Sequence, residues 1–385
     1  MEHIYRTDFP HRPELEDTMT YFFGIDLHKT QFTVHYRTED RIAKEIVQYA
    51  TDGDGYAEFL RRIRSLRTRG YEVRIGVEST GNTRFFKNKV EQAGAVVTVI
   101  NTLKFKVINE STKKTDRHDA ATISEFLSKD MLPESYLCSK DTENIRRLLK
   151  SRERLVRSIV GQKNEVHALL VSMGLQDDLR SIQSKKGRQK VLDTLSSQSD
   201  LVLEAQTVKL LFEIIGRIEE SVKKVEGQLH GLLDGDGMVR RLLTIRGCGP
   251  ITAWTIRAYT EDIGRFASAK KYAAFCGLVP WVQDSNRTVH HGKITKRGPQ
   301  ELRTAFVQLV LGIRRCGDTG KWRLMQRYEY MKRGKGSGKS IVAAARKMAE
   351  LVWTLLTDRV DFDSRRMEGN YTPPSESLAE QAAFA

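Results

Sequence analysis

"YFFGID" (21–26) and "VRIGVE" (73–78) are short apolar runs that each end in a carboxylate, Asp26 and Glu78. Apolar runs of this length, rich in β-branched and aromatic residues, predict buried β-strands. Only a few residues separate the first run from two more strand-like runs, so antiparallel hairpins are expected there. The other predicted strands are "QFTVHY" (31–36), "RIAKEIVQY" (41–49) and "AVVTVI" (95–100).

Helical patterns at about 54–68 and 83–93, and a third from Asp116, give the order β-β-β-α-β-α-β-α. Three antiparallel strands followed by βαβ units predict a mixed sheet with helices on its faces. This is the order of a ribonuclease H-like domain. The predicted fold class is α/β for this part and mainly α for the remainder of the chain.

In "KKTDRHDA" (113–120), Asp116 and Asp119 lie three residues apart and therefore share one helical face. One interpretation is an ordinary helix start, with Thr115 as N-cap and acids in the first turn. The other is a metal site, because Asp26 and Glu78 end strands that can lie side by side beneath this helix. Four converging carboxylates would repel one another and would be neutralised by Mg²⁺ or Mn²⁺. The basic neighbours predicted to contact phosphates are Lys113, Lys114 and Arg117.

The bulk composition fits a globular protein, with 385 residues, 39% hydrophobic and 29% charged. No run of 18 apolar residues is present, and the N-terminal segment lacks the apolar stretch of a secretory signal. A cytoplasmic, nucleoid-associated location is the expectation, with residues 1–19 as a flexible leader. The four cysteines, which form no zinc or disulfide spacing, are Cys138, Cys248, Cys276 and Cys316.

The net charge of +15 is concentrated in one segment. Residues 281–347 hold sixteen Lys/Arg and four Asp/Glu. So large a local excess indicates a polyanionic partner, and nucleic acid is the usual one.

Residues 136–237 show helical periodicity throughout. One seam within them alternates in steps of four and three, which indicates either an antiparallel helical hairpin or an intermolecular coiled coil. The two patterns are identical in sequence, so both interpretations stay open. The seam residues are Leu211, Ile215, Ile218, Val222, Val225, Leu229 and Leu232.

A further domain is expected at 238–361, and a disordered tail at 362–385. "LLTIRGCGPITAWTI" (242–256) resembles a helix-hairpin-helix element, in which Gly247 and Gly249 would expose backbone N–H groups to a phosphate. "DSNRTVHHGKITKRG" (284–298) predicts an irregular segment that contains Ser285. The residues expected near it to contact nucleic acid are Arg287, His290, His291, Lys293, Lys296, Arg297 and Arg303.

"RGKGSGKS" (333–340) is similar to a Walker phosphate-binding loop, but the pattern requires glycine where Arg333 stands. It predicts a flexible basic loop that leads into a helix.

Several stretches together resemble the DEDD transposases of the insertion sequence 110 family, close to the Piv-type DNA invertases, over roughly residues 20–360. They are "FFGIDLHKTQFTV", "GVESTGN", "VINTLKFKVINESTKKTDRHDA", "LLTIRGCGPITAWTI", "YAAFCGLVPW" and "SNRTVHHGKITKRGPQELR". The resemblance implies a RuvC-like domain at 20–135, a helical coiled-coil linker and a C-terminal transposase domain. It also implies Asp26, Glu78, Asp116 and Asp119 as metal ligands and Ser285 as nucleophile, although the family's usual Ser-Gly is here Ser285-Asn286.

The resemblance implies a magnesium-dependent DNA transposase or recombinase that acts as a homo-oligomer on donor and target DNA, guided by a bridge RNA. We expect the metals of the RuvC-like domain to activate Ser285, in a composite active site. Two alternatives remain: a RuvC-like junction nuclease that uses metals alone, and a non-catalytic scaffold that binds nucleic acid.

Overall fold

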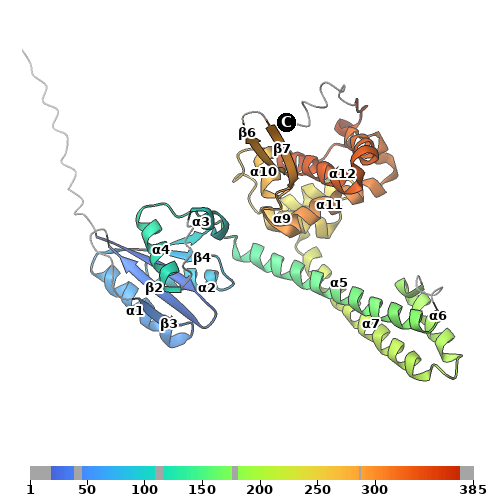
Figure 1. Cartoon of the computed structure of the whole chain (residues 1–385), viewed down its shortest axis with the longest axis horizontal. Helices are drawn as coiled ribbons and strands as arrows, with labels where there is room; N and C mark the ends of the chain where they lie inside the picture. Colours follow the sequence, from blue (N-terminus) through green and yellow to red (C-terminus); the bar gives the residue numbers. More distant parts are fainter. Residues whose placement is uncertain (1–18, 39–45, 109–115, 176–180, 286–287, 373–385) are drawn as a thin grey trace, which may run out of the picture. The chain divides into compact units, whose positions relative to one another are not determined.

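The computed structural model describes residues 19–38, 46–108, 116–175, 181–285 and 288–372 (Figure 1). The chain divides into two compact units, Met1–Leu137 and Cys138–Ala385. The predicted leader, residues 1–19, lies outside the described residues except for Met19.

The first unit is built on a five-stranded mixed sheet with the order β3-β2-β1-β4-β5. The β1–β2 and β2–β3 pairs are antiparallel, whereas β1–β4 and β4–β5 are parallel. The predicted mixed sheet and its strand order along the chain are therefore confirmed, and they are consistent with a ribonuclease H-like domain. The strands are β1 (Thr20–Leu27), β2 (Gln31–Arg37), β3 (Val47–Ala50), β4 (Glu72–Glu78) and β5 (Val96–Ile100).

Helices cover both faces of this sheet. Alternate strand residues such as Phe23 and Ile75 point to one face and form a core with α1 and α2, in which Phe32, Phe59 and Phe86 are fully buried. The other face is covered by α4, which contacts β1, β2 and β4. A short helix after β5 was not predicted. The helices of this unit are α1 (Gly53–Thr68), α2 (Thr83–Gln92), α3 (Thr102–Ile108) and α4 (Asp116–Ser128).

In the second unit, α5 (Lys140–Ser172) and α7 (Val202–His230) pack antiparallel as a long hairpin (Figure 1). At its far end Val166, Leu170 and Ile215 join a small core with α6 (Lys185–Ser196). Nearer the remainder of the unit, Arg152 donates to Glu226 at 2.7 Å. The predicted seam of α7 thus faces α5 of the same chain, which is the hairpin interpretation of its pattern.

The rest of the second unit surrounds a core in which Trp254, Tyr272 and Phe306 are almost completely buried. Beside the core, Gly247 (φ +82°) lies so close to α11 (Gln300–Arg315) that a Cβ would meet the Ile313 nitrogen at 2.4 Å. The elements are α8 (Gly237–Thr244), α9 (Pro250–Thr260), α10 (Ala269–Phe275), β6 (Pro280–Ser285), β7 (Thr288–Ile294), α11 (Gln300–Arg315) and α12 (Arg323–Asp358).

Three expectations for this unit were wrong. The segment around Ser285 is not irregular, because β6 and β7 form an antiparallel hairpin. Residues 333–340 are not a loop, because α12 runs through them with a kink at Gly336, whose φ of 79° is not helical. Part of the predicted tail is ordered. Phe362 packs on Trp322, and Trp322 also forms an antiparallel β-bridge with Glu368. A 3₁₀ turn spans Ser364–Met367. Residues 373–385 lie outside the described residues.

None of the helices in the described ranges is long and apolar enough to cross a membrane.

The neighbours Ile214 and Ile215 provide a test of the hairpin, since Ile215 is fully buried whereas Ile214 is 44% exposed. An unpaired charge in a core is strongly destabilising, so Ile215→Asp should lower the free energy of unfolding by several kcal/mol, about 3 or more. Ile214→Asp should change it by about 0.5 kcal/mol or less. Urea denaturation followed by circular dichroism measures both; equal losses in the two variants would contradict the observed hairpin packing.

Candidate active site

Two carboxylates lie side by side at one edge of the sheet. Ile25 pairs with Val77 in the parallel β1–β4 ladder, so the next residues, Asp26 and Glu78, are neighbours as well. They share the face of the sheet that α4 covers, because Gly24 and Gly76, two residues earlier in each strand, contact α4. The Asp26 side chain is 15% exposed. The predicted juxtaposition of these two acids is therefore observed.

The third carboxylate comes from α4, which begins at Asp116 as expected. Asp119 lies in the first turn of this helix and is half-buried. The side chains of Asp116 and Arg117 lie outside the described residues, as do Lys113 and Lys114 entirely. The structure therefore places three of the four predicted acids and the helix start that bears the fourth.

The charges of these acids act on one another at Glu78. Burial raises the pKa of the Glu78 carboxyl, and the negative charges of Asp26 and Asp119 raise it further. Lys106 and His28 partly oppose this increase in the pKa. The three carboxylates are thus close enough for their repulsion to be felt, although they come from three separate elements.

The chemistry of this donor set, though not its spacing in the described part of the chain, fits a hard divalent cation. Among the side chains that the structure describes, no three His, Cys, Asp or Glu groups already lie close enough to hold a metal ion. Carboxylate oxygens are nevertheless the ligands that Mg²⁺ and Mn²⁺ prefer, and a cation would relieve the repulsion that raises the pKa of Glu78. Asp26, Glu78 and Asp119 are the described residues that would bind it.

Four residues around the carboxylates were missed in the sequence. His28 Nε2 lies 3.0 Å from Asp26 Oδ2. The positive charge of Lys106, in α3, lowers the pKa of Glu78. His35 of β2 and Ser124 of α4 hydrogen-bond beneath the helix at 2.7 Å. The spacing of His28 to Asp26 is local and could have been noticed, whereas the others become neighbours only through the fold.

The second group of predicted residues lies on the β6–β7 hairpin and the turn after it. Ser285 ends β6, with its side chain outside the described residues, as are the side chains of His290 and His291 in β7 and the whole of Arg287. The described basic side chains that are exposed are Lys293, Lys296 and Arg297.

Two predicted contacts have structural roles that the sequence did not indicate. Arg303 is half-buried and donates to the Lys296 carbonyl at 3.3 Å, so it braces the turn after β7. Gly247, which is exposed, is required by its φ of +82° and by its close approach to α11. Gly249 is the N-cap of α9, and a Cβ there would meet nothing within 4 Å.

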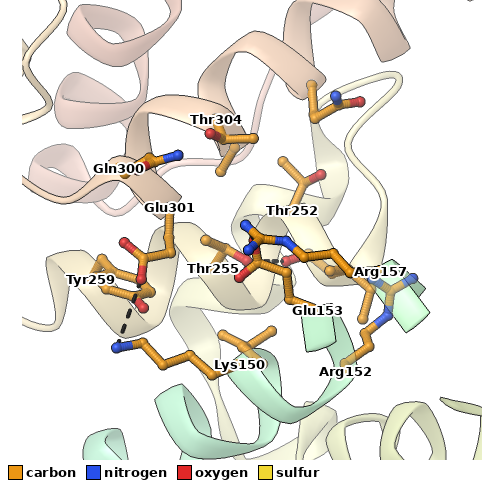
Figure 2. A pocket seen from close by; sticks show the side chains of 14 residues that line it. Lys150, Arg152, Glu153, Arg157, Thr252, Thr255, Tyr259, Gln300, Glu301 and Thr304 are labelled. Atoms are coloured by element: carbon orange, nitrogen blue, oxygen red, sulfur yellow. Dashed lines mark hydrogen bonds and ion pairs between the residues drawn. The ribbon is translucent and has the colours of Figure 1, made fainter. Parts of the chain in front are cut away.

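A cavity of about 290 Å³ opens between α5, α9 and α11 (Figure 2). Its rim has mixed charge: Lys150 Nζ lies 3.8 Å from Glu301 Oε1, and Arg157 pairs with Glu153. Hydroxyls of Thr252 and Thr255 line its floor. None of the residues predicted for the active site lines this cavity.

Two family profiles match the chain. One, described as "Transposase IS116/IS110/IS902 family", matches residues 239–328, and the other, described as "Transposase" and named for DEDD transposases of IS110, matches residues 23–175. The second range includes the three described carboxylates and the first includes Ser285. Both units of the chain are thus matched.

Similar proteins extend over most of the chain. It is 26% identical over 342 residues to a probable family 20 transposase of Pseudomonas aeruginosa, covering 87% of this chain and 96% of that protein. It is 29% identical over 260 residues to a transposase for insertion sequence element IS1111A of Coxiella burnetii, covering 64% and 67% respectively. A pilin gene-inverting protein of Moraxella lacunata is 21% identical over 89% of this chain and 98% of its own. From the two profiles and these relatives, the chain belongs to the IS110 family of transposases, enzymes that recombine DNA.

Proposed function

We propose that this transposase cleaves and exchanges DNA strands with two groups of residues, a carboxylate site and a serine nucleophile. The carboxylates are Asp26, Glu78, Asp116 and Asp119, and the nucleophile is Ser285. The observation that supports this best is the convergence of Asp26, Glu78 and Asp119 from three elements, which is reflected in the raised pKa of Glu78. Acids so placed destabilise the fold, and a catalytic role explains why they are there.

In this proposal the carboxylates bind a divalent cation, which when bound supplies charge stabilisation for phosphodiester chemistry. Asp26 and Glu78 are held by adjacent strands, so their backbones are fixed relative to each other. Asp119 closes the site from α4. Lys106 contributes positive charge near Glu78, where the negatively charged DNA backbone would approach.

Ser285 would conserve the energy of the cleaved bond. Its hydroxyl attacks a phosphodiester phosphorus, loses its proton to a base, and forms a phosphoserine bond while the leaving sugar oxygen takes up a proton. Reversal of these steps on a new strand end joins the strands. A nuclease that activates water releases free ends and cannot do this.

The proposed partners are DNA and a guide RNA. The guide RNA is implied by the resemblance to relatives that a bridge RNA guides. The excess of Lys/Arg in residues 281–347 supports a polyanion there. Of the exposed basic residues, Lys293 lies in β7, which pairs with β6, and Lys296 and Arg297 follow directly after it.

Replacing Glu78 by Gln should stabilise the metal-free protein at neutral pH. Because the folded-state pKa of Glu78 is raised, the folded protein retains this proton at a higher pH than the unfolded chain, in which the ordinary value is 4.5. The stability cost of Glu78 therefore grows as the pH rises through its folded-state pKa and is absent below about 4.5. Denaturant unfolding of wild type and Glu78→Gln between pH 4 and 8 measures it.

The exposed Glu72 at the other end of the same strand is the matched control, and Glu72→Gln should not show this pH-dependent gain. If Glu78→Gln were less stable than wild type at pH 7, the proposed repulsion between Glu78 and the neighbouring acids would be contradicted.

Replacing Ser285 by Ala should abolish both strand exchange and the covalent protein–DNA adduct, because the Ser285 hydroxyl is the proposed attacking group. The adduct is measured by denaturing electrophoresis after reaction with a suicide DNA substrate in Mg²⁺. Asp119→Asn should also lose the adduct, with unchanged DNA affinity. Strand exchange at the normal rate by Ser285→Ala would reject the covalent mechanism, and an active Asp119→Asn protein would remove Asp119 from the proposed metal site.

Changing Lys293, Lys296 and Arg297 together to Gln should weaken binding to DNA and reduce its salt dependence. Each lost phosphate contact lowers the log–log salt slope by ~0.9 for duplex DNA. A triple variant of the exposed α7 residues Lys209, Lys223 and Lys224 removes the same charge and should leave the slope unchanged. Fluorescence anisotropy at several salt concentrations measures the slope. Equal slopes for wild type and the variant changed at Lys293, Lys296 and Arg297 would show that DNA binds elsewhere.

A further inference from the structure

The helix that bears Asp119 lies in direct backbone contact with the sheet. Gly24 and Gly76 are opposite each other in the β1–β4 ladder. A Cβ at Gly24 would lie 2.0 Å from the Ala120 carbonyl oxygen, and one at Gly76 would lie 2.8 Å from Ile123 Cγ2. The first contact is to the backbone of α4, so only glycine at position 24 allows the helix to approach this closely. The second is to a side chain, which would have to move if position 76 carried a Cβ. Gly24 thus sets the depth of α4 on the sheet, and Gly76 leaves room for Ile123.

A buried hydrogen bond holds the same helix along its axis. His35 Nδ1 lies 2.7 Å from Ser124 Oγ, and the two residues are only 4% and 0% exposed. The Ser124 hydroxyl donates its single proton to the Ala121 carbonyl at 2.8 Å. With that proton on the Ala121 carbonyl, Ser124 Oγ accepts from His35 in the tautomer that carries its proton on Nδ1. His35 is itself opposite Gly24 in the β1–β2 ladder, so both constraints act at one place on the sheet.

We propose that His35 and Ser124 are positioning residues for the carboxylate site, acting together with the glycine pair. Ser124 is little more than one helical turn beyond Asp119 on a helix without any Pro or Gly between them. A slip of α4 by one residue would move Asp119 by about 1.5 Å. Metal–ligand distances tolerate only about 0.2 Å, so the anchor of α4 decides whether Asp119 can share a cation with Asp26 and Glu78. The inference rests on the proposed metal site.

A merely structural hydrogen bond would make a different prediction from a positioning one. If His35 and Ser124 only stabilise the fold, their loss lowers stability and leaves cation affinity unchanged in the protein that stays folded. If they position Asp119, cation affinity falls even where stability is kept. The two roles are therefore separated by measuring Mn²⁺ binding and thermal unfolding on the same variants.

The experiment is calorimetric titration of the full-length, DNA-free protein with Mn²⁺. Ser124→Ala should weaken Mn²⁺ binding about tenfold, the lower end of the effect of removing groups that orient metal ligands. His35→Leu combined with Ser124→Ala should weaken it similarly. The double variant removes both partners of this hydrogen bond together, and its thermal unfolding is measured alongside to show that it stays folded.

Ser128→Ala is the matched control, because Ser128 on the same helix bonds only within the helix, to the Glu125 carbonyl at 2.9 Å. It should bind Mn²⁺ like wild type. His35→Asn, whose side-chain amide can take the place of the ring nitrogen in this hydrogen bond, should bind Mn²⁺ more tightly than the double variant.

The outcomes separate the two proposals. Wild-type Mn²⁺ affinity in a folded His35→Leu, Ser124→Ala protein would overturn the positioning role while the metal site stands. If wild type itself shows no Mn²⁺ binding that Glu78→Gln removes, the metal site fails and this inference fails with it.

Discussion

A parallel ladder joins β1 to β4 with Gly24 opposite Gly76, and this register determines where Asp26 and Glu78 lie. Because strand side chains alternate, the residues two positions further along, Asp26 and Glu78, must emerge on the same face. A register shifted by one residue would place a carboxylate in the aromatic core with Phe32 and Phe59. The apolar face of the sheet thereby enforces the arrangement of the acids on the opposite face.

The acids of the carboxylate site are close at a cost in stability. Glu78 loses hydration and meets two like charges, as its raised pKa records, and the rest of the unit supplies the stability that offsets this. The offset comes from the opposite face of the sheet, where Phe59 and Phe86 are fully buried. One face thus carries the aromatic core and the other the acids, which follows from the two-residue period of a strand.

The strands and most helices of the first unit could be predicted because their apolar runs are continuous and bounded by turn residues. The acids at the strand ends could be predicted for the same reason. The β6–β7 hairpin escaped prediction because its polar, basic sequence lacks a strand-like apolar pattern. The packing of Phe362 on Trp322 and the pairing of His35 with Ser124 join residues far apart in the chain, the latter 89 residues, and no local pattern reports such contacts. The glycines of residues 333–340 suggested a loop, whereas α12 runs through them and is kinked at Gly336.

The α5–α7 hairpin is anchored at both ends in separate cores, with Ile145 and Leu229 at one end and Val166 and Ile215 at the other. Between these ends its seam residues are only half-buried and belong to neither core. A matched gain or loss of seven residues in both helices would keep the seam in phase and change the length of the rod by about 10 Å. In evolutionary terms, this middle stretch is where related sequences can differ in length by whole heptads while both cores are inherited unchanged.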